Sequence, residues 1–396
     1  MQKKDITEIR DSSRSPSNVE VPFGSNCVRL SLREWLIVGI VFSALLCFGP
    51  TLWERIEQFE PGPDYRLPYE LSSDYWLQAR YCRWACSPSP SEGRGSRYSA
   101  GRLTAETLVI GDSVVWGHYV SKDNTLSHYL NKIAGRNQFA NMGVDGIHPA
   151  ALAGLLKYYG RDIKDVNVLL HFNPLWMSSK KHDLQIDKEF HFNHPKLVPQ
   201  FTPDIPCYKN SYSRRLSAVV ERYVTFLSWT SHLKITYFDS MDLPAWTLEH
   251  PYENPLKAVT LKLPSSENDY QNERISWKEK GTPTQDFQWV ELETSLQWNF
   301  FQRSIEILKA RGNTVFVLVG PFNEHMLKGK SIDTYRRMKS EIETWLQQNN
   351  VPYYMPPALP SNLYVDASHP LSEGYTMLAK QLYENELFRT SILCSE

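Results

Sequence analysis

Leu108-Val109-Ile110-Gly111-Asp112-Ser113 is the stretch that decides the fold, and Val114-Val115-Trp116-Gly117 follows it. A short apolar, β-branched run predicts a buried strand, and the glycine after it predicts a sharp turn out of that strand. Ligands of open α/β sheets bind at the carboxyl ends of the strands, where a serine at the start of a helix presents its hydroxyl. Because Gly-Asp-Ser is also an ordinary turn composition, the rest of the chain must decide whether Ser113 is a nucleophile.

A segment more than 250 residues further along, Tyr364-Val365-Asp366-Ala367-Ser368-His369-Pro370, supplies the partners that a serine nucleophile needs. A serine hydroxyl is a poor nucleophile at neutral pH, and it requires a base that a carboxylate holds in one tautomer. Asp366 and His369 are three residues apart, so both can lie on one turn. We therefore expect Ser113, His369 and Asp366 to form a catalytic triad.

The two segments together resemble the SGNH (GDSL-type) hydrolase family, whose first block is Gly-Asp-Ser and whose last block is Asp-x-x-His before the C-terminal helix. Asn141-Met142-Gly143-Val144-Asp145-Gly146 is similar to the second block of that family. The third block, Gly-x-Asn-Asp, corresponds here to His171-Phe172-Asn173-Pro174, which retains the Asn but has His and Pro at the other two positions. This departure leaves the triad intact and makes the shape of the pocket, and hence the substrate, uncertain from the sequence.

The resemblance implies an oxyanion hole built from three donors. These are the backbone N–H groups of Ser113 and Gly146, with Gly143 as the alternative glycine, and the side-chain amide of Asn173. Neither a cofactor nor a metal ion is expected. The residues expected around the substrate follow two strand ends, and they are Asp112, His171, Asn323, Glu324 and His325.

The segment Asn323-Glu324-His325 has two competing interpretations. His325 is the alternative to His369 as the catalytic base, and the adjacent Asp366 favours His369. Alternatively, Asn323 caps a helix and Glu324 occupies its first turn.

Strands and helices alternate along the chain, which predicts a parallel sheet with helices on both faces. Strands are expected at Thr107–Gly111, Gln138–Met142, Val166–Phe172, Thr314–Gly320 and Val351–Met355, and helices at Asn124–Ala134, Ala150–Tyr159, Val290–Arg311, Ile332–Gln348 and Ser372–Glu384. The predicted fold class is a three-layer α/β/α sandwich of SGNH or flavodoxin-like type. An aromatic-rich insertion at about 178–290 interrupts the pattern and should lie over the active site. Its tryptophans either stack on sugar rings or, as we favour, form the core of the insertion: Trp229, Trp246, Trp277 and Trp289.

The N-terminal part of the chain predicts one transmembrane helix. No charged residue lies between Trp35 and Trp53, and the run is close to the length that a hydrocarbon core of about 30 Å requires. Basic residues precede the run and acidic residues follow it, which predicts a cytoplasmic N-terminus and an extracytoplasmic catalytic domain, in a bacterial periplasm or at the cell surface. The expected divisions are a disordered cytoplasmic tail at 1–33, the membrane helix at 34–53, a linker at 54–100 and the hydrolase-like domain at 101–396.

Composition argues against a nucleic-acid partner and predicts at least one disulfide bond. A formal net charge of −1 gives no electrostatic support for a nucleic-acid partner. Outside the membrane, disulfides persist, and we expect at least one among the four cysteines of that region: Cys82, Cys86, Cys207 and Cys394. Zinc binding by these four is disfavoured because they contain only one close pair. The three neighbouring histidines of the insertion are expected in a surface loop: His182, His191 and His194.

Three functions follow from these expectations. The first is a membrane-anchored serine esterase that removes acyl groups, in the first instance acetyl, from an extracytoplasmic substrate such as a cell-envelope glycan. The alternative is an O-acyltransferase that acetylates a polysaccharide with the same triad and takes its acyl group from a partner membrane acyltransferase. The third is a non-catalytic binding or assembly protein on the same fold, which would have no need of Ser113, Asp366 and His369.

Overall fold

The computed structural model describes residues 30–59, 61–62, 64–86, 106–263 and 274–393. It divides into two compact units, residues 1–49 and residues 50–396. The first unit contains most of the apolar part of helix α1 (Leu32–Ile56), which is long and apolar enough to cross a membrane. The second unit contains the sheet and all of the candidate site residues.

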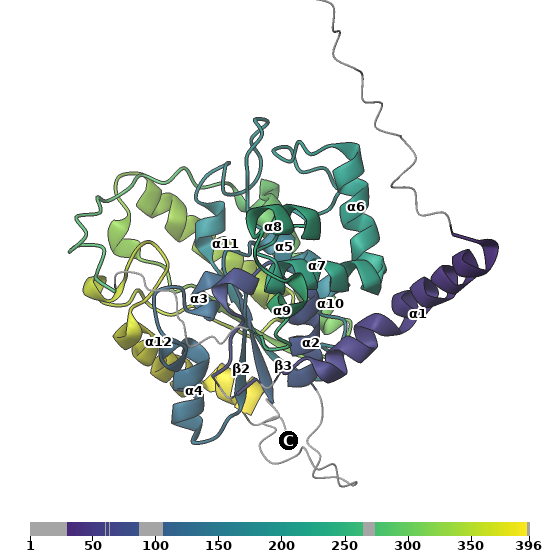
Figure 1. Cartoon of the computed structure of the whole chain (residues 1–396). Coiled ribbons are helices and arrows are strands. Elements are labelled where there is room, and N and C mark those ends of the chain that lie inside the picture. The colour runs from purple at the N-terminus through teal and green to yellow at the C-terminus, as the bar shows by residue number, and fades with distance from the viewer. Residues whose placement is uncertain (1–29, 60, 63, 87–105, 264–273, 394–396) are drawn as a thin grey trace, which may run out of the picture. The chain divides into compact units, whose positions relative to one another are not determined.

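The described part of the second unit contains a parallel five-stranded sheet in the order β2-β1-β3-β4-β5 (Figure 1). The strands are β1 (Thr107–Gly111), β2 (Phe139–Gly143), β3 (Asn167–Phe172), β4 (Thr314–Val319) and β5 (Tyr353–Tyr354). All four neighbouring pairs run parallel, with Thr107 opposite both Phe139 and Asn167. The predicted parallel α/β sheet is therefore confirmed. The strand order reverses between β1 and β3, which is where open sheets of this kind form their binding crevice.

Alternate side chains of the central strands belong to two different hydrophobic clusters, as the two-residue period of a strand requires. Val109, Leu169 and Phe316 pack with helices α4 (Leu126–Ala134) and α12 (Ser372–Glu384). Their neighbours Leu108 and Val168 pack with helices α5 (Pro149–Tyr158), α10 (Leu296–Lys309) and α11 (Ser331–Gln348). Burial on both sides explains why these strands are continuous apolar runs instead of alternating ones.

The described part of the insertion between β3 and α10 contains four α-helices joined by long irregular segments. Its helices are α6 (Tyr212–Tyr223), α7 (Thr225–Tyr237), α8 (Leu243–Glu249) and α9 (Pro255–Ala258). Trp246, Trp277 and Trp289 are buried, and Trp229 is half-buried. Trp246 packs within the insertion, on Phe238 and His250, as expected of a residue of its core. Trp277 and Trp289 belong instead to the main hydrophobic core, so the expectation that they form a separate core of the insertion is wrong. Helix α10 begins at Leu296 and not at Val290, because Ser295 caps it and Asp183 accepts its first N–H groups.

The linker expected at 54–100 is wrong for the residues up to 86. Glu57 and Asp74 are buried on either side of His232 from α7: Glu57 Oε1 lies 2.9 Å from His232 Nε2, and Asp74 Oδ2 lies 2.6 Å from Nδ1. Glu57 also accepts from Arg80 of helix α2 (Tyr75–Ala85), at 2.6 Å. Burial would lower the pKa of His232, but the two carboxylates raise it to about 9. The two carboxylates are thus paired with the His232 imidazolium and the Arg80 guanidinium, which allows them to be buried. The segment up to residue 86 is part of the compact unit. Residues 87–100 lie outside the described residues.

The expected disulfide is not present among the described cysteines. Cys82, Cys86 and Cys207 have free thiols, and Cys394 lies outside the described residues. Cys82 is buried in the core beside Leu77 and Tyr81, where a thiol behaves as a small apolar side chain. Burial also raises the pKa of the Cys86 thiol to about 12, so it is protonated at neutral pH.

The three histidines of the insertion do not all lie in a surface loop. His194 is buried, and its ring nitrogens contact the Tyr75 hydroxyl at 3.0 Å and the Asp145 carbonyl at 2.8 Å. His182 contacts Ser178, and His191 is exposed. In the described part of the chain, no cluster of His, Cys, Asp and Glu suits a metal ion.

Candidate active site

Ser113 is the first residue of the short helix α3 (Ser113–Trp116), directly after β1. Asp112 caps this helix by accepting the Val114 N–H at 3.0 Å. The turn requires glycine at position 111, since a Cβ there would lie 2.5 Å from Val115 Cγ2 and 2.7 Å from His171 Cβ. The tight turn that the sequence predicts therefore places the Ser113 hydroxyl at the carboxyl edge of the sheet.

A chain of hydrogen bonds joins Ser113 to the C-terminal loop, across 256 residues of sequence. Ser113 Oγ lies 2.8 Å from His369 Nε2. His369 Nδ1 lies 2.8 Å and 2.9 Å from the two carboxylate oxygens of Asp366. The backbone N–H groups of Ser368 and His369 also donate to Asp366 Oδ1, at 2.9 Å and 3.0 Å. The structure thus brings together the three residues that the sequence predicts as a triad.

The electrostatics of the triad favour an ionised Asp366 and a basic His369. Burial alone would raise the pKa of Asp366, but the His369 imidazolium and the two backbone N–H groups lower it to about 2. Burial would lower the pKa of His369, yet Asp366, with smaller contributions from Asp112 and Asp145, raises it above its ordinary value. A carboxylate that stabilises the imidazolium is what a general base requires when it takes the serine proton.

Asn323, Glu324 and His325 do not line the reacting centre. Asn323 is fully buried, and it holds the triad loop by donating from Nδ2 to the Asp366 carbonyl at 3.0 Å and from its backbone N–H to the Ala367 carbonyl at 2.8 Å. Glu324 forms an ion pair with Lys339 at 3.1 Å, and His325 Nε2 lies 2.9 Å from the Leu359 carbonyl. His369, and not His325, is therefore the histidine in hydrogen-bond contact with Ser113, and Asn323 positions the loop that contains His369.

The side-chain amide of Asn173 is held by two hydrogen bonds. Its Oδ1 accepts the Leu175 N–H at 3.0 Å, and its Nδ2 donates to Asp112 Oδ2 at 2.8 Å. An amide nitrogen has two hydrogens, so one remains for an oxyanion.

The candidate backbone donors are those of Ser113, in the first turn of a helix, and Gly146, whose φ is +66°. The alternative, Gly143, donates instead to Asn141 Oδ1 at 3.0 Å, which removes it as a donor. Gly143 is required for close packing, because a Cβ there would lie 2.2 Å from the Trp116 nitrogen.

Asp112 and His171 are buried behind the nucleophile. Asp112 Oδ2 accepts from Trp176 Nε1 at 3.0 Å as well as from Asn173, and His171 Nδ1 lies 3.2 Å from Asp112 Oδ1. Burial raises the pKa of Asp112, but the contacts with His171 and Asn173 outweigh it and lower that pKa. With His148, these residues line a small cavity beneath Asn173. Contact of Asp112 and His171 with a substrate stays a prediction.

Two aromatic residues that were not predicted from the sequence, His118 and Tyr119, pack against the His369 ring. The rings of His118 and Tyr119 have their centroids 5.4 Å and 5.3 Å from that of His369. His118 Nδ1 also lies 2.6 Å from Asp145 Oδ1. Asp145 belongs to the second block of the resemblance, so its charge was visible in the sequence, whereas the packing of His118 and Tyr119 was not.

Arg66 stabilises the loop that contains His118 and Tyr119 through hydrogen bonds to its backbone carbonyls. Its side chain is 1% exposed and donates to the carbonyls of Trp116 and Gly117 at 2.8 Å and 2.7 Å, and to that of Val120 at 2.9 Å. The guanidinium carbon lies 4.0 Å from the centroid of the Trp116 ring, close enough for a cation–π contact. A residue from the range expected to be a linker therefore supports the nucleophile helix.

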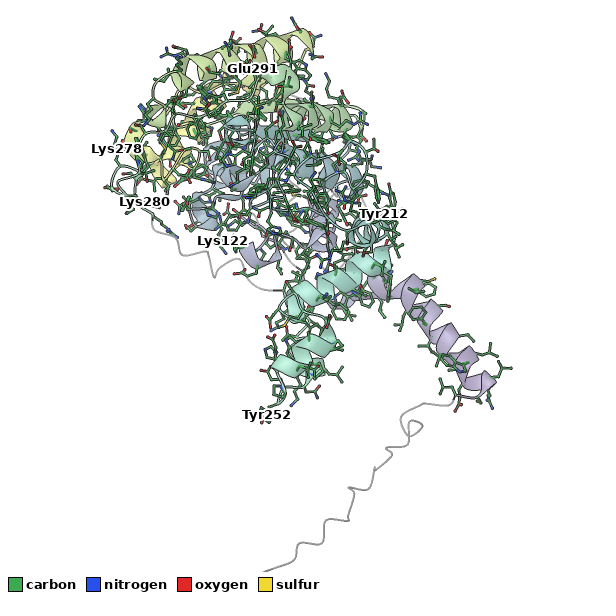
Figure 2. All side chains as sticks on the ribbon, turned by 90° about the horizontal axis from the view of Figure 1, so that it is seen from above. Lys122, Tyr212, Tyr252, Lys278, Lys280 and Glu291 are labelled. Carbon is green, nitrogen blue, oxygen red and sulfur yellow. The ribbon has the colours of Figure 1, made fainter. Side chains whose placement is uncertain are left out.

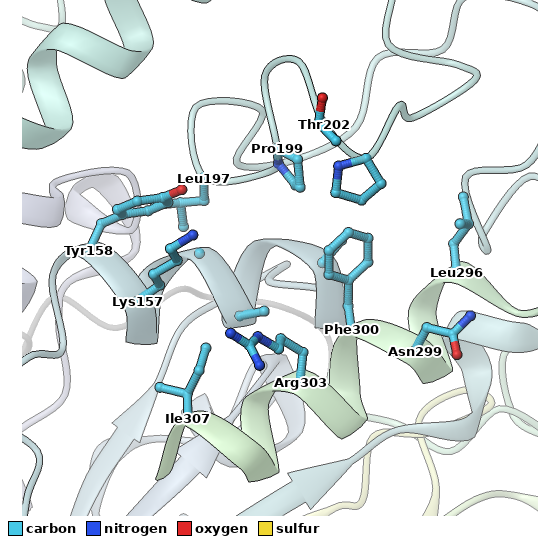
Figure 3. A pocket seen from close by; sticks show the side chains of 14 residues that line it. Lys157, Tyr158, Leu197, Pro199, Thr202, Leu296, Asn299, Phe300, Arg303 and Ile307 are labelled. Carbon is cyan, nitrogen blue, oxygen red and sulfur yellow. The ribbon is translucent and has the colours of Figure 1, made fainter. Parts of the chain in front are cut away.

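A separate cavity of about 420 Å³ lies over α5 and α10, beneath the 197–203 loop, and includes no triad residue (Figure 3). Its lining is mostly apolar, with Lys157 and Arg303 among the side chains around it. Arg303 forms an exposed ion pair with Glu306.

Asn173→Ala is expected to lower kcat for an ester substrate by about 10²–10³-fold, because one oxyanion donor is lost. Labelling of Ser113 by a phosphonate should persist, since the triad is untouched. Steady-state kinetics and labelling on the same preparation would test this. Unchanged kcat would exclude Asn173 from the oxyanion hole, and loss of labelling would show that it acts on the nucleophile instead.

A scan of the sequence against protein-family models finds no match.

Proposed function

We propose that this chain is a membrane-anchored serine esterase of SGNH type, which acts on acyl esters of an extracytoplasmic substrate through an acyl-serine intermediate. The observation that carries the proposal is the 2.8 Å contact between Ser113 Oγ and His369 Nε2, with Asp366 at 2.8 Å behind the imidazole. These distances lie within the range that general-base activation of a nucleophile requires. A non-catalytic scaffold would not require this alignment.

The proposed reaction has two halves. His369 takes the Ser113 proton as Oγ attacks the ester carbonyl, and the N–H groups of Ser113 and Gly146, with the Asn173 amide, stabilise the oxyanion. Collapse of this intermediate breaks the bond to the alcohol oxygen, which leaves with the proton from His369. Water, activated by the same histidine, then cleaves the acyl-serine bond and releases the acid.

The fold and the chain order are consistent with this type of enzyme. We propose that the two hydrophobic clusters correspond to the helical layers of an α/β/α sandwich, with the nucleophile at the reversal point between β1 and β3.

In the proposed membrane topology, the N-terminus is cytoplasmic and residues from 54 onward are extracytoplasmic. A reporter that is active only in the cytoplasm, fused after Glu396, should therefore give no signal. A matched fusion before residue 30 would serve as the control. An active reporter on the intact C-terminal fusion would contradict this topology.

The activity is tested with the full-length chain in detergent. Hydrolysis of p-nitrophenyl acetate and covalent labelling by a serine-directed phosphonate are expected. Repeating the assay with a soluble oligosaccharide acceptor separates the esterase from the O-acyltransferase, because the two share every step up to the second nucleophile. Acyl transfer that outpaces hydrolysis would favour the transferase, and the absence of both hydrolysis and labelling would contradict the proposal.

A further inference from the structure

One segment of the insertion, residues 276–282, is fixed to the loop that leads into the triad. Trp277 is buried, its backbone N–H donates to the Tyr364 carbonyl at 2.9 Å, and its indole Nε1 donates to the Ser361 carbonyl at 2.8 Å. The segment closes on itself through the Thr282 N–H, which donates to the Trp277 carbonyl at 3.0 Å. Residues between Trp277 and Thr282 are thus held in place beside the catalytic loop.

This segment places a lysine close to the catalytic histidine. Lys280 Nζ lies 5.0 Å from the centroid of the Tyr119 ring, and that ring packs edge-on against the imidazole of His369. Lys278 is exposed two residues earlier, and Figure 2 shows both lysines at one edge of the molecule. Within the described ranges, no carboxylate lies within ion-pair distance of either ammonium group. Glu279, between them, accepts instead from the backbone N–H and hydroxyl of Ser276, at 2.8 Å and 2.9 Å.

The two lysines contrast with the charges next to the nucleophile. Asp366, Asp112 and Asp145 all raise the pKa of His369, so the reacting centre itself is an environment of negative charge. A group of negative charge on the substrate would be repelled there and attracted to the ammonium groups beyond Tyr119. The half-buried Tyr119 ring contacts both regions, through Lys280 Nζ and through the His369 imidazole.

We infer that the alcohol part of the substrate is an acidic sugar, whose negative charge binds to Lys280 and Lys278. This inference rests on the proposed function, since it places the ester carbonyl at Ser113 and the acyl group on the side of Asn173. It specifies the substrate class as an ester of an anionic glycan.

Binding is measured first without catalysis, on the full-length Ser113→Ala variant in detergent, by calorimetric titration with trigalacturonate. The matched probe is its fully methyl-esterified form, which has the same rings and no charge. The acid is expected to bind more tightly than the neutral form, and added salt should weaken only the acid. In the Ser113→Ala background, replacing both lysines (Lys278→Gln and Lys280→Gln) should weaken binding of the acid by about 10-fold.

The control is Lys164→Gln, an exposed lysine just before β3 at the opposite, amino-terminal edge of the sheet. This variant should bind trigalacturonate as the parent does. Equal affinity of the two probes, or unchanged affinity in the double lysine variant, would overturn the inference.

Catalysis gives an independent measurement. In the chain that retains Ser113, trigalacturonate should inhibit hydrolysis of p-nitrophenyl acetate competitively, with an inhibition constant about 10-fold higher in the double lysine variant. If no ester is hydrolysed, the proposed function fails, and the titration still decides whether the lysines bind an acidic sugar. If esters are hydrolysed but trigalacturonate neither binds nor inhibits, only the inference about the substrate fails.

Discussion

Ser113→Ala is expected to lower kcat for p-nitrophenyl acetate by about 10⁴–10⁶-fold and to abolish phosphonate labelling. The reason is that Ser113 Oγ is the hydroxyl within hydrogen-bond reach of His369 Nε2, at 2.8 Å, and alanine leaves no atom to form the acyl-enzyme. The substitution is small and lies at the first position of α3, so the fold should be retained. Kinetics of the purified variant, with circular dichroism to verify folding, provide the measurement.

The same series contains its own control and a test of coupling. Ser127→Ala removes a buried hydroxyl on α4, whose contact is with Thr125, and should leave the rate within about twofold of the parent. His369→Ala should be almost as damaging as Ser113→Ala, and the double variant should be little worse than either, because the residues act as a unit. Substantial turnover by Ser113→Ala, against esters that the parent hydrolyses, would refute the assignment of the nucleophile.

Asp366→Asn is expected to lower kcat by about 10⁴-fold, although it changes the shape of the side chain very little. An Asn oxygen can still accept the backbone N–H groups that Asp366 Oδ1 accepts now. The amide nitrogen would then replace Oδ2, which faces His369 Nδ1 at 2.8 Å. Since an amide NH₂ donates, Nδ1 would have to accept, and the imidazole proton would move to Nε2.

The wrong tautomer explains the size of this effect. A proton on Nε2 would point at Ser113 Oγ, and the histidine could no longer take the serine proton. Thermal unfolding of the variant should show a folded protein, which distinguishes a lost base from a collapsed loop. A decrease in kcat of less than tenfold would indicate that Asp366 does not orient His369 during the reaction.

The two segments of the triad could be predicted from the sequence because each is local, and their pairing across 256 residues was supported by the resemblance to the SGNH family. The Gly-Asp-Ser turn follows directly from an apolar strand, and Asp366 and His369 are close enough in sequence to share a turn. The position of Asn173 also followed from its place at the end of a buried strand. These signals depend on short-range backbone geometry, which sequence patterns encode well.

Side-chain directions at the same sheet edge could not be predicted in this way. Asn323 follows β4 as Asn173 follows β3, yet Asn323 holds the backbone of the triad loop and Asn173 lies beside Asp112. The difference arises from packing against residues 366 and 367, which are more than 40 positions away in sequence. Lys280 could likewise not be predicted as a residue near the site. Its position depends on the hydrogen bond from Trp277 to the loop that leads into the triad.

The extent of the catalytic unit was also misjudged from composition. The sequence between 54 and 100 is rich in charge and proline, which is typical of an exposed segment. Glu57 and Asp74 are nevertheless buried and Arg80 is half-buried, because their charges are neutralised by one another and by His232, more than 150 residues away from the two carboxylates. A single sequence contains no signal for a pairing at that separation.

The burial of Glu57 and Arg66 determines where a form of the proposed enzyme without the apolar helix can start. A chain shortened to residue 101, the boundary that composition suggests, would leave His232 without either carboxylate and the Trp116–Val120 loop without the guanidinium that binds three of its carbonyls. A protein cut at that point would lose the proposed esterase activity for reasons unrelated to Ser113. Removal of the apolar part of α1, the proposed membrane anchor, should therefore stop before Pro50, so that the last two turns of α1 are retained.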